Sequence, residues 1–279
     1  MNARADCPRY CGMATLAMKD TGRVPVPRAL QEAIMAAYIK PFSPADLAAN
    51  PRKYYRAQYI WELPVRLTHW INAACIVVLF STGIYISHPV LAPIGEAYKH
   101  FVMGTVREIH FAAALIFLVS FLARVYWFYM GNNYARSGFP FFWRRSWWND
   151  LVRQTADYFK LERGHIHLGH NALGGLAYTL CVIGLGWAQV FTGLAMYSES
   201  NPGGWLNKLV GWVIPLLGGS FQTHMWHHLF AWGFLAFAIL HVYIVLYDSH
   251  QYRNGLITGM ISGLKFYQEG DIEGDKWLG

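Results

Sequence analysis

The chain has 279 residues, of which 54% are hydrophobic and only 14% are charged. A soluble domain usually carries about 25% charged residues, so this composition argues against an ordinary soluble globular protein. The formal net charge is +7 at pH 7. The basic residues flank apolar runs and form no patterned patch, which argues against a nucleic-acid-binding protein.

Four stretches are long enough to cross a bilayer, which needs about 20 apolar residues. Residues 67–87 carry no charge, and residues 109–130 carry only Arg124. Residues 172–196 are uncharged and rich in glycine, and residues 226–247 are uncharged but hold three histidines. The chain also has 12 Trp and 17 Tyr, which suit the two membrane interfaces. We therefore predict an all-α membrane protein, built as a bundle of four transmembrane helices.

Basic residues are distributed unevenly around these stretches. Ten Lys and Arg precede the first stretch and six lie between the second and third, whereas the other two connections hold two and one. The positive-inside rule then places both termini and the middle connection in the cytoplasm. We expect a cytoplasmic extension that could be partly disordered (1–56), a transmembrane domain (57–268) and a cytoplasmic tail (269–279). Segments 147–161 and 205–217 could form amphipathic helices on the cytoplasmic and outer surfaces, respectively.

Histidines recur inside the predicted spans. They lie at the inner end of the first, the outer end of the second, and along the fourth and its entrance: His69, His110, His224, His227, His228 and His241. An ionisable side chain in a membrane segment is costly and is a functional candidate by default. A single histidine could equally be hydrogen-bonded to a neighbouring helix. Several histidines on three helices at matching depths favour a binding site.

Helix geometry selects two histidines of the fourth span. His227 and His241 are 14 residues apart, which is about 40° short of whole turns at about 100° per residue, so both point to one face. Along the axis they are roughly 21 Å apart. His224 and His228 point to other faces than His241. The spacing predicts one site near each membrane surface.

Depth then predicts the pairs. His227 lies at the outer level with His110, and His241 lies at the inner level with His69. Two neutral imidazoles on each iron would make two b-type haem sites for electron transfer, because no coordination position is left for substrate. Arg66 and Arg124 lie at the inner level and could bind the anionic propionates of the inner haem. Metal transport is a competing interpretation, but such sites usually add acidic or cysteine ligands, and the predicted spans hold no acidic residue.

Several segments resemble the b-type cytochrome subunit of membrane-bound nickel–iron uptake hydrogenases. The resemblance covers residues 55–268, and the segments that carry it are, in order, YIWELPVRLTHWINA, VREIHF, RVYWFYMGNNYARS, WRRSWW, LGHNALG, FTGLAMYSES, HMWHHLF and ILHVY. The sequence is also similar, more distantly, to the cytochrome subunit of respiratory formate dehydrogenases, which shares four spans and two haems.

The resemblance implies a subunit of the bacterial inner membrane, surrounded by lipid, that anchors a hydrogenase on its outer face. Electrons would pass from the iron–sulfur small subunit, which links to the large subunit, through two b haems to quinone. The family's haem ligands match His69, His110, His227 and His241. Quinone would bind near the inner haem, where Asn171 and His170 are candidates. A hydrogen bond at a helix start is an equally good interpretation of His170.

Two other functions fit some of these features. The chain has no CxxC pairs for nickel and no cysteine clusters for iron–sulfur centres, so we do not expect it to split hydrogen itself. It could instead be a membrane anchor whose histidines are structural and that has no redox role. It could also be a stand-alone dihaem b-type membrane reductase. A haem spectrum distinguishes a haem protein from a plain anchor. Purification with or without a hydrogenase distinguishes a hydrogenase subunit from a stand-alone reductase.

Overall fold

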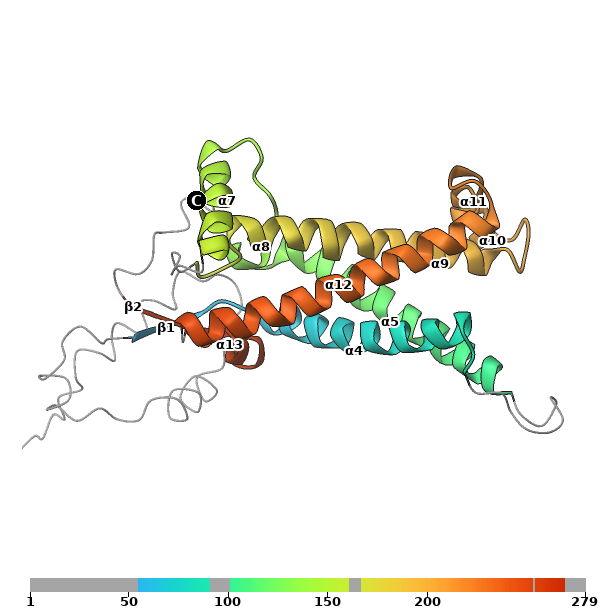
Figure 1. Ribbon diagram of the computed structural model, residues 1–279, viewed down its shortest axis with the longest axis horizontal. Coiled ribbons are helices and arrows are strands. Elements are labelled where there is room, and N and C mark those ends of the chain that lie inside the picture. Colours follow the sequence, from blue (N-terminus) through green and yellow to red (C-terminus); the bar gives the residue numbers. More distant parts are fainter. Residues whose placement is uncertain (1–54, 91–100, 161–166, 253, 269–279) are drawn as a thin grey trace, which may run out of the picture.

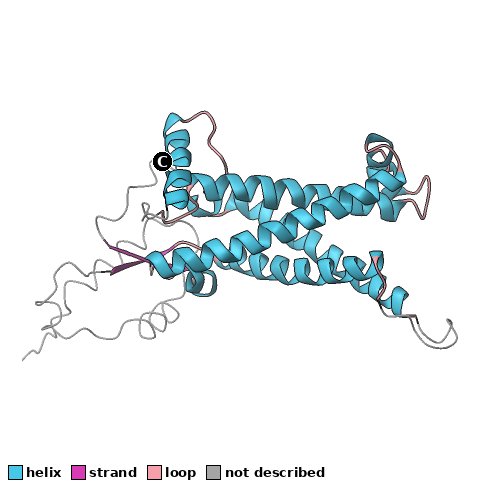
Figure 2. Ribbon diagram, viewed as in Figure 1, coloured by secondary structure: helices cyan, strands magenta, loops and turns pink. Residues whose placement is uncertain are grey.

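The computed structural model describes residues 55–90, 101–160, 167–252 and 254–268 (Figure 1). Nearly all of the predicted extension at 1–56 and all of the predicted tail at 269–279 lie outside the described residues. Helices dominate the described part, with two short strands at one end (Figure 2). In chain order the elements are β1 (Tyr55–Tyr59), α4 (Leu63–Ser87), α5 (Val102–Met130), α6 (Asn133–Arg136), α7 (Arg145–Lys160), α8 (Ala172–Ala177), the π-helical segment η2 (Tyr178–Gly184), α9 (Leu185–Ser198), α10 (Trp205–Val210), α11 (Val213–Leu216), α12 (Ser220–Tyr252), α13 (Leu256–Ser262) and β2 (Leu264–Gln268).

The prediction of four transmembrane helices is confirmed. Four helical stretches are long and apolar enough to cross a membrane: Leu63–Ser87, Val102–Met130, Ala172–Ser198 and Ser220–Gln251. The third consists of α8, η2 and α9 in continuous succession. The first, second and fourth begin four to seven residues before the predicted starts. The second therefore includes Glu108, and the fourth also runs further at its end and includes Asp248. The expectation of spans without acidic residues holds only for the shorter predicted ranges.

The four spans form two close pairs, α4 with α5 and α9 with α12. In Figure 1 α4 lies below and α8–α9 lie above. Helix α5 crosses from the end of α4 toward α8, and α12 crosses from α9 at its start toward α4 at its end. The short helices α10 and α11 gather at one end of the bundle, which we call the α10 end. The opposite end holds the strands, α13 and α7, and we call it the sheet end. Helix α7 lies across the direction of the spans, as a helix on a membrane surface would.

Much of the apolar surface of the spans is uncovered. Among its described side chains, α12 buries only Thr223 and Phe234. Leu115 and Val119 on α5 are 58% and 67% exposed, and many large apolar side chains are similarly open. A soluble monomer rarely shows so large an apolar surface. Because lipid can cover it, the chain is an integral membrane protein.

A small aromatic core holds the middle of the bundle together. Phe117 and Phe121 of α5 stack with ring centres 5.7 Å apart, and Phe234 of α12 meets Phe117 edge-on. Gly186 of α9 admits the ring of Phe121, because a Cβ there would stand 2.9 Å from it. This cluster separates the histidines of the α10 end from those of the sheet end.

The two strands join the segment before the first span to the segment after the last. They are antiparallel, with Tyr59 opposite Leu264 and Tyr55 opposite Gln268. Gly263 makes the turn into β2 with φ of 86°, and a Cβ there would lie 2.5 Å from the Tyr59 ring. These strands were not predicted from the sequence.

A buried carboxylate locks the start of α4 against the end of α5. Glu62 is 7% exposed, and its Oε2 accepts hydrogen bonds from Trp127 Nε1 and from the backbone N–H of Asn132, both at 2.9 Å. Removing the acceptor leaves two donors without a partner, at about 1–3 kcal/mol each.

We expect Glu62→Ala to lower the thermal unfolding temperature in detergent clearly, and Glu62→Gln, which keeps an acceptor oxygen, to lower it much less. Leu63→Ala, at a side chain that is 61% exposed, is the control and should leave the temperature unchanged. Equal losses for Glu62→Ala and Glu62→Gln would show that the hydrogen bonds do not stabilise this junction.

Candidate functional site

The histidines predicted to act in pairs lie at two levels of the bundle. His69 of α4 and His241 of α12 face each other toward the sheet end, with ring centres 6.3 Å apart and planes tilted by 55°. His110 of α5 and His227 of α12 both lie toward the α10 end, where Thr82 of α4 and Thr192 of α9 contact them. The fold therefore brings His69 and His241 face to face, and it places His110 and His227 at the same end of the bundle.

The His69–His241 pair has the spacing that a six-coordinate haem iron needs. An imidazole nitrogen binds a metal at about 2.0–2.1 Å, so two rings on opposite sides of one ion have centres about 6 Å apart. The Nδ1 of His69 is buried and has no hydrogen-bond partner within the described part of the chain. The residues at this level fit a b-type haem.

At the α10 end each histidine is held by a threonine. His110 Nδ1 lies 2.8 Å from Thr82 Oγ1 of α4, and His227 Nδ1 lies 2.8 Å from Thr192 Oγ1 of α9. Each ring thus has Nδ1 engaged, which leaves Nε2 for another partner. His224 instead bonds the Ser220 carbonyl of its own helix at 2.9 Å, which agrees with its exclusion on helical geometry.

Two arginines at the sheet end have donors to spare. Arg124 is 7% exposed; its Nη2 donates to the Ala135 carbonyl at 3.0 Å, while its Nη1 is buried without a partner among the described residues. Arg66 donates through Nη1 to the Ile261 carbonyl, and its Nε is likewise buried and unpartnered within the described ranges. Spare guanidinium donors suit an anionic group such as a haem propionate.

The quinone candidates lie at the same end. Asn171 is the N-cap of α8, where its Oδ1 accepts from Gly174 N at 2.6 Å and its Nδ2 donates to Gln154 Oε1 at 3.1 Å. Both functional groups of this amide are therefore engaged within the protein. The structure uses Asn171 to start a helix and to attach that helix to α7.

His170 has one nitrogen fixed. Its Nδ1 and its backbone N–H each lie 3.0 Å from Ser137 Oγ, which itself donates to the Tyr134 carbonyl at 2.7 Å. The hydroxyl therefore accepts from Nδ1–H, and Nε2 is left unprotonated. Burial, together with the nearby positive charges of Arg124 and Lys265, lowers the pKa of His170 to about 3. His170 is a neutral imidazole at physiological pH, and its contacts with Ser137 join the residue before the α8 N-cap to the C-cap of α6.

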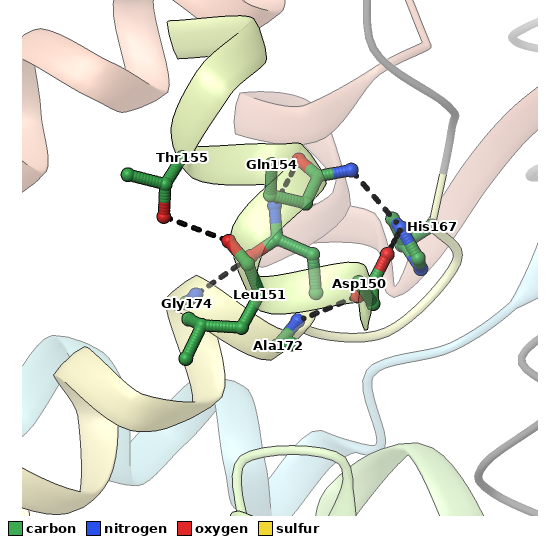
Figure 3. Close-up of polar contacts among 8 residues, drawn as sticks. Asp150, Leu151, Gln154, Thr155, His167, Ala172 and Gly174 are labelled. Carbon is green, nitrogen blue, oxygen red and sulfur yellow. Dashed lines mark hydrogen bonds and ion pairs between the residues drawn. The ribbon is translucent and has the colours of Figure 1, made fainter. Parts of the chain in front are cut away.

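Sequence reasoning missed a buried polar network between α7 and α8 (Figure 3). Asp150 Oδ1 lies 3.3 Å from His167 Nε2, and Asp150 Oδ2 accepts from Ala172 N at 3.1 Å. Gln154 Nε2 lies 3.2 Å from the same His167 nitrogen. The spacing of Asp150 and Gln154, one helical turn apart, was the available signal. Lys265, 3% exposed and donating to the Leu168 carbonyl at 2.8 Å, was missed because no pattern marks it.

The chain matches the family described as prokaryotic cytochrome b561 over residues 60–263. It is similar to a protein of Azotobacter chroococcum mcd 1 named "Probable Ni/Fe-hydrogenase B-type cytochrome subunit", with 40% identity over 218 residues, or 76% of this chain and 90% of the relative. A protein of the same name from Cupriavidus necator is 38% identical over 221 residues, or 78% and 90%. The "Probable Ni/Fe-hydrogenase 1 B-type cytochrome subunit" of Escherichia coli (strain K12) is 34% identical over 227 residues, or 77% and 94%.

The network of Figure 3 predicts a pH dependence. Burial alone would raise the pKa of Asp150, but His167, the Ala172 N–H and Arg153 outweigh it, and the pKa lies below its ordinary value of 3.8. A carboxyl with a lowered folded-state pKa stabilises the fold above its unfolded pKa and loses that contribution as the pH falls.

Asp150→Asn should therefore lower the unfolding temperature near neutral pH, and the difference from wild type should shrink below about pH 4. Thermal unfolding of the purified protein across that range measures it. Asp157→Asn, seven residues along α7 and outside this network, is the control and should show no such trend. A difference that stays constant with pH would mean that the Asp150 charge contributes nothing.

Proposed function

The chain belongs to the prokaryotic cytochrome b561 family, and on that premise we propose that it is the b-type cytochrome subunit of a membrane-bound nickel–iron hydrogenase. In this role it anchors the hydrogenase and carries its electrons through two haems to quinone. The names of the similar proteins support the hydrogenase as partner. The observation that carries the electron-transfer part is the facing pair His69 of α4 and His241 of α12, two helices of an apolar bundle, with ring centres 6.3 Å apart.

Each residue of the two levels has a part in this proposal. His69 with His241 and His110 with His227 are the axial ligand pairs, and Arg66 and Arg124 bind propionates at the sheet end. A haem held by two histidines supplies one-electron transfer and has no coordination position open to substrate. The protein keeps water away with the aromatic core of Phe117, Phe121 and Phe234, and it fixes the rings in place.

Helix α12 connects the two levels, because it carries one ligand of each pair 14 residues apart. We place the iron–sulfur small subunit, and through it the large subunit, at the α10 end on the outer face of the inner membrane. Exposed apolar side chains there offer a docking surface: Trp205, Leu209, Trp212 and Leu216. The expected interface also includes segment 89–106, whose residues 102–106 belong to α5 and whose residues 91–100 lie outside the described residues. Both termini are then cytoplasmic.

Quinone is reduced at the sheet end in this proposal. His170 and Asn171 are its candidate partners, and their contacts suggest different parts. The amide of Asn171 is engaged with Gly174 and Gln154, so we assign it to positioning. His170 keeps Nε2 as an acceptor, so we assign it the direct contact, in which it would hold a quinol hydroxyl proton. Hydrogen oxidation on one face and quinone reduction on the other would make turnover electrogenic.

The first test is cofactor content. Pyridine haemochrome analysis of the purified full chain should give two b haems per polypeptide. His69→Ala or His241→Ala should remove one haem, and His110→Ala or His227→Ala should remove the other. His224→Ala is the matched control on α12 and should keep both.

Two results would contradict the proposal. A folded preparation without haem, even when haem is supplied during expression, would support a plain anchor. A dihaem protein that purifies and acts without any hydrogenase would support a stand-alone reductase.

The second test separates quinone reduction from electron entry. We expect His170→Gln to slow hydrogen-driven quinone reduction by about tenfold or more, because a group at the reacting oxygens is lost. Hydrogen should still reduce a soluble dye and both haems at the wild-type rate. His250→Gln, an exposed histidine in the last turn of α12, is the control.

Proteoliposomes test the direction. Turnover from hydrogen to quinone should generate a membrane potential. If turnover proceeds at full rate without a potential, quinone is reduced at the α10 end and the assignment of His170 is wrong.

A further inference from the structure

The two helices that run toward the α10 end carry the same dipeptide. Thr82-Gly83 lies near the end of α4, and Thr192-Gly193 lies near the end of α9. Each dipeptide faces one histidine of the antiparallel helix paired with its own, His110 on α5 for the first and His227 on α12 for the second. The surrounding sequences, FSTGIY and VFTGLA, share little else.

Contacts of the two threonines within their own helices determine the direction of their hydrogen bonds to the histidines. Thr82 Oγ1 lies 2.7 Å from the Val78 carbonyl, and Thr192 Oγ1 lies 2.6 Å from the Ala188 carbonyl. A carbonyl oxygen can only accept, so each hydroxyl donates its single proton to a carbonyl of its own helix. The contact to the histidine, 2.8 Å in both cases, then requires the histidine to donate. Nδ1 of His110 and of His227 therefore carries the proton, and Nε2 carries the lone pair.

The glycines leave space for the rings. A Cβ at Gly83 would stand 3.5 Å from His110 Cε1, and a Cβ at Gly193 would stand 3.3 Å from His227 Cε1. The distance at Gly83 is an ordinary van der Waals contact, whereas the distance at Gly193 would require the His227 ring to shift by a few tenths of an ångström. The threonine thus fixes one side of each imidazole, and the glycine admits its edge.

The sheet end lacks this arrangement at His69. The threonine next to it, Thr68, donates to the Pro64 carbonyl at 2.8 Å. Within the described residues, no hydroxyl reaches His69 Nδ1, which is buried without a partner. The two levels therefore differ in how their histidines are held, although both use one histidine from α12.

We propose that the two Thr-Gly dipeptides are positioning elements that set the tautomer and ring orientation of the histidine pair at the α10 end and thereby lower the reduction potential of the haem bound there. This inference rests on the proposed function, since it assumes that His110 and His227 are iron ligands. A donated Nδ1–H makes Nε2 more electron-rich, which favours the oxidised iron. Electrons entering at the α10 end then pass toward the level whose ligands lack this support.

The test is a redox titration of the full chain in its hydrogenase complex, with each haem followed by its optical and EPR signals. Thr82→Val and Thr192→Val remove the hydroxyl and keep the shape. Each should raise the reduced-to-oxidised ratio of the α10-end haem about threefold at a fixed ambient potential, or roughly 30 mV at 59 mV per decade. Both together should shift it further, and the EPR signal of that haem alone should change.

Three controls define the outcome. Thr82→Ser and Thr192→Ser keep the acceptor and should keep the wild-type potential. Thr68→Val removes a hydroxyl of the same kind from the sheet end of α4 and should leave the reduction potential of the α10-end haem unchanged. Gly193→Ala should alter the EPR signal of this haem more than Gly83→Ala does. If a valine variant does not fold, the alanine and serine variants of the same threonine give the comparison.

Two outcomes distinguish a failure of this inference from a failure of the proposed function. Wild-type protein without haem at His110 and His227 overturns the proposed function, and this inference with it. Two haems in the wild type, with potentials and EPR signals that do not respond to Thr→Val at either position, overturn the inference alone.

Discussion

A bilayer interior offers no hydrogen-bond partners, so every polar group within the spans must find one in the protein or in what the protein binds. This constraint accounts for the polar side chains of the bundle. The hydroxyls of Thr82 and Thr192 donate to carbonyls of their own helices and accept hydrogen bonds from histidines. Several groups that the protein does not satisfy within its described part, such as His69 Nδ1 and Arg124 Nη1, lie toward the sheet end, although Gln189 Oε1 on α9 is unsatisfied as well. Those at the sheet end suit a group that carries both a metal and anionic substituents.

The two ends of the bundle meet the constraint differently. At the α10 end each histidine is hydrogen-bonded to the helix paired with its own. Helix α4 supplies the threonine for His110 of α5, and α9 supplies the threonine for His227 of α12. The sheet end depends on contacts between distant parts of the chain, such as Arg66 with α13 and Lys265 with the Leu168 carbonyl. Cations are concentrated there, and the buried carboxylate of Glu62 is used for a structural junction.

The sequence predicted most of the fold because apolar length and basic flanks are local properties. The four spans and their order could be read directly, and α7 lies at the segment predicted as amphipathic. Residue spacing on one helix also favoured His227 over His224 and His228, and that choice stays a prediction. Contacts between distant segments could not be predicted in this way. β1 pairs with a strand from the other end of the described chain, and Asp150 meets His167 across an intervening connection.

Threonine and glycine are common in membrane helices, which is why the Thr-Gly dipeptides carried no signal before their histidines were placed beside them. Asn171 differs, because its sequence context did indicate a site residue. Its hydrogen bonds place it at the start of α8, where it also attaches that helix to α7. A resemblance identifies which residues matter, whereas hydrogen-bond geometry separates those that touch a ligand from those that hold them.

The pairing of β1 with β2 constrains the order of assembly. During synthesis β1 emerges before any of the four spans, and its partner emerges after all of them. Joining segments so far apart has a large entropic cost that only a nearly complete bundle can offset. The sheet therefore forms last and closes the chain into a ring across one face of the membrane.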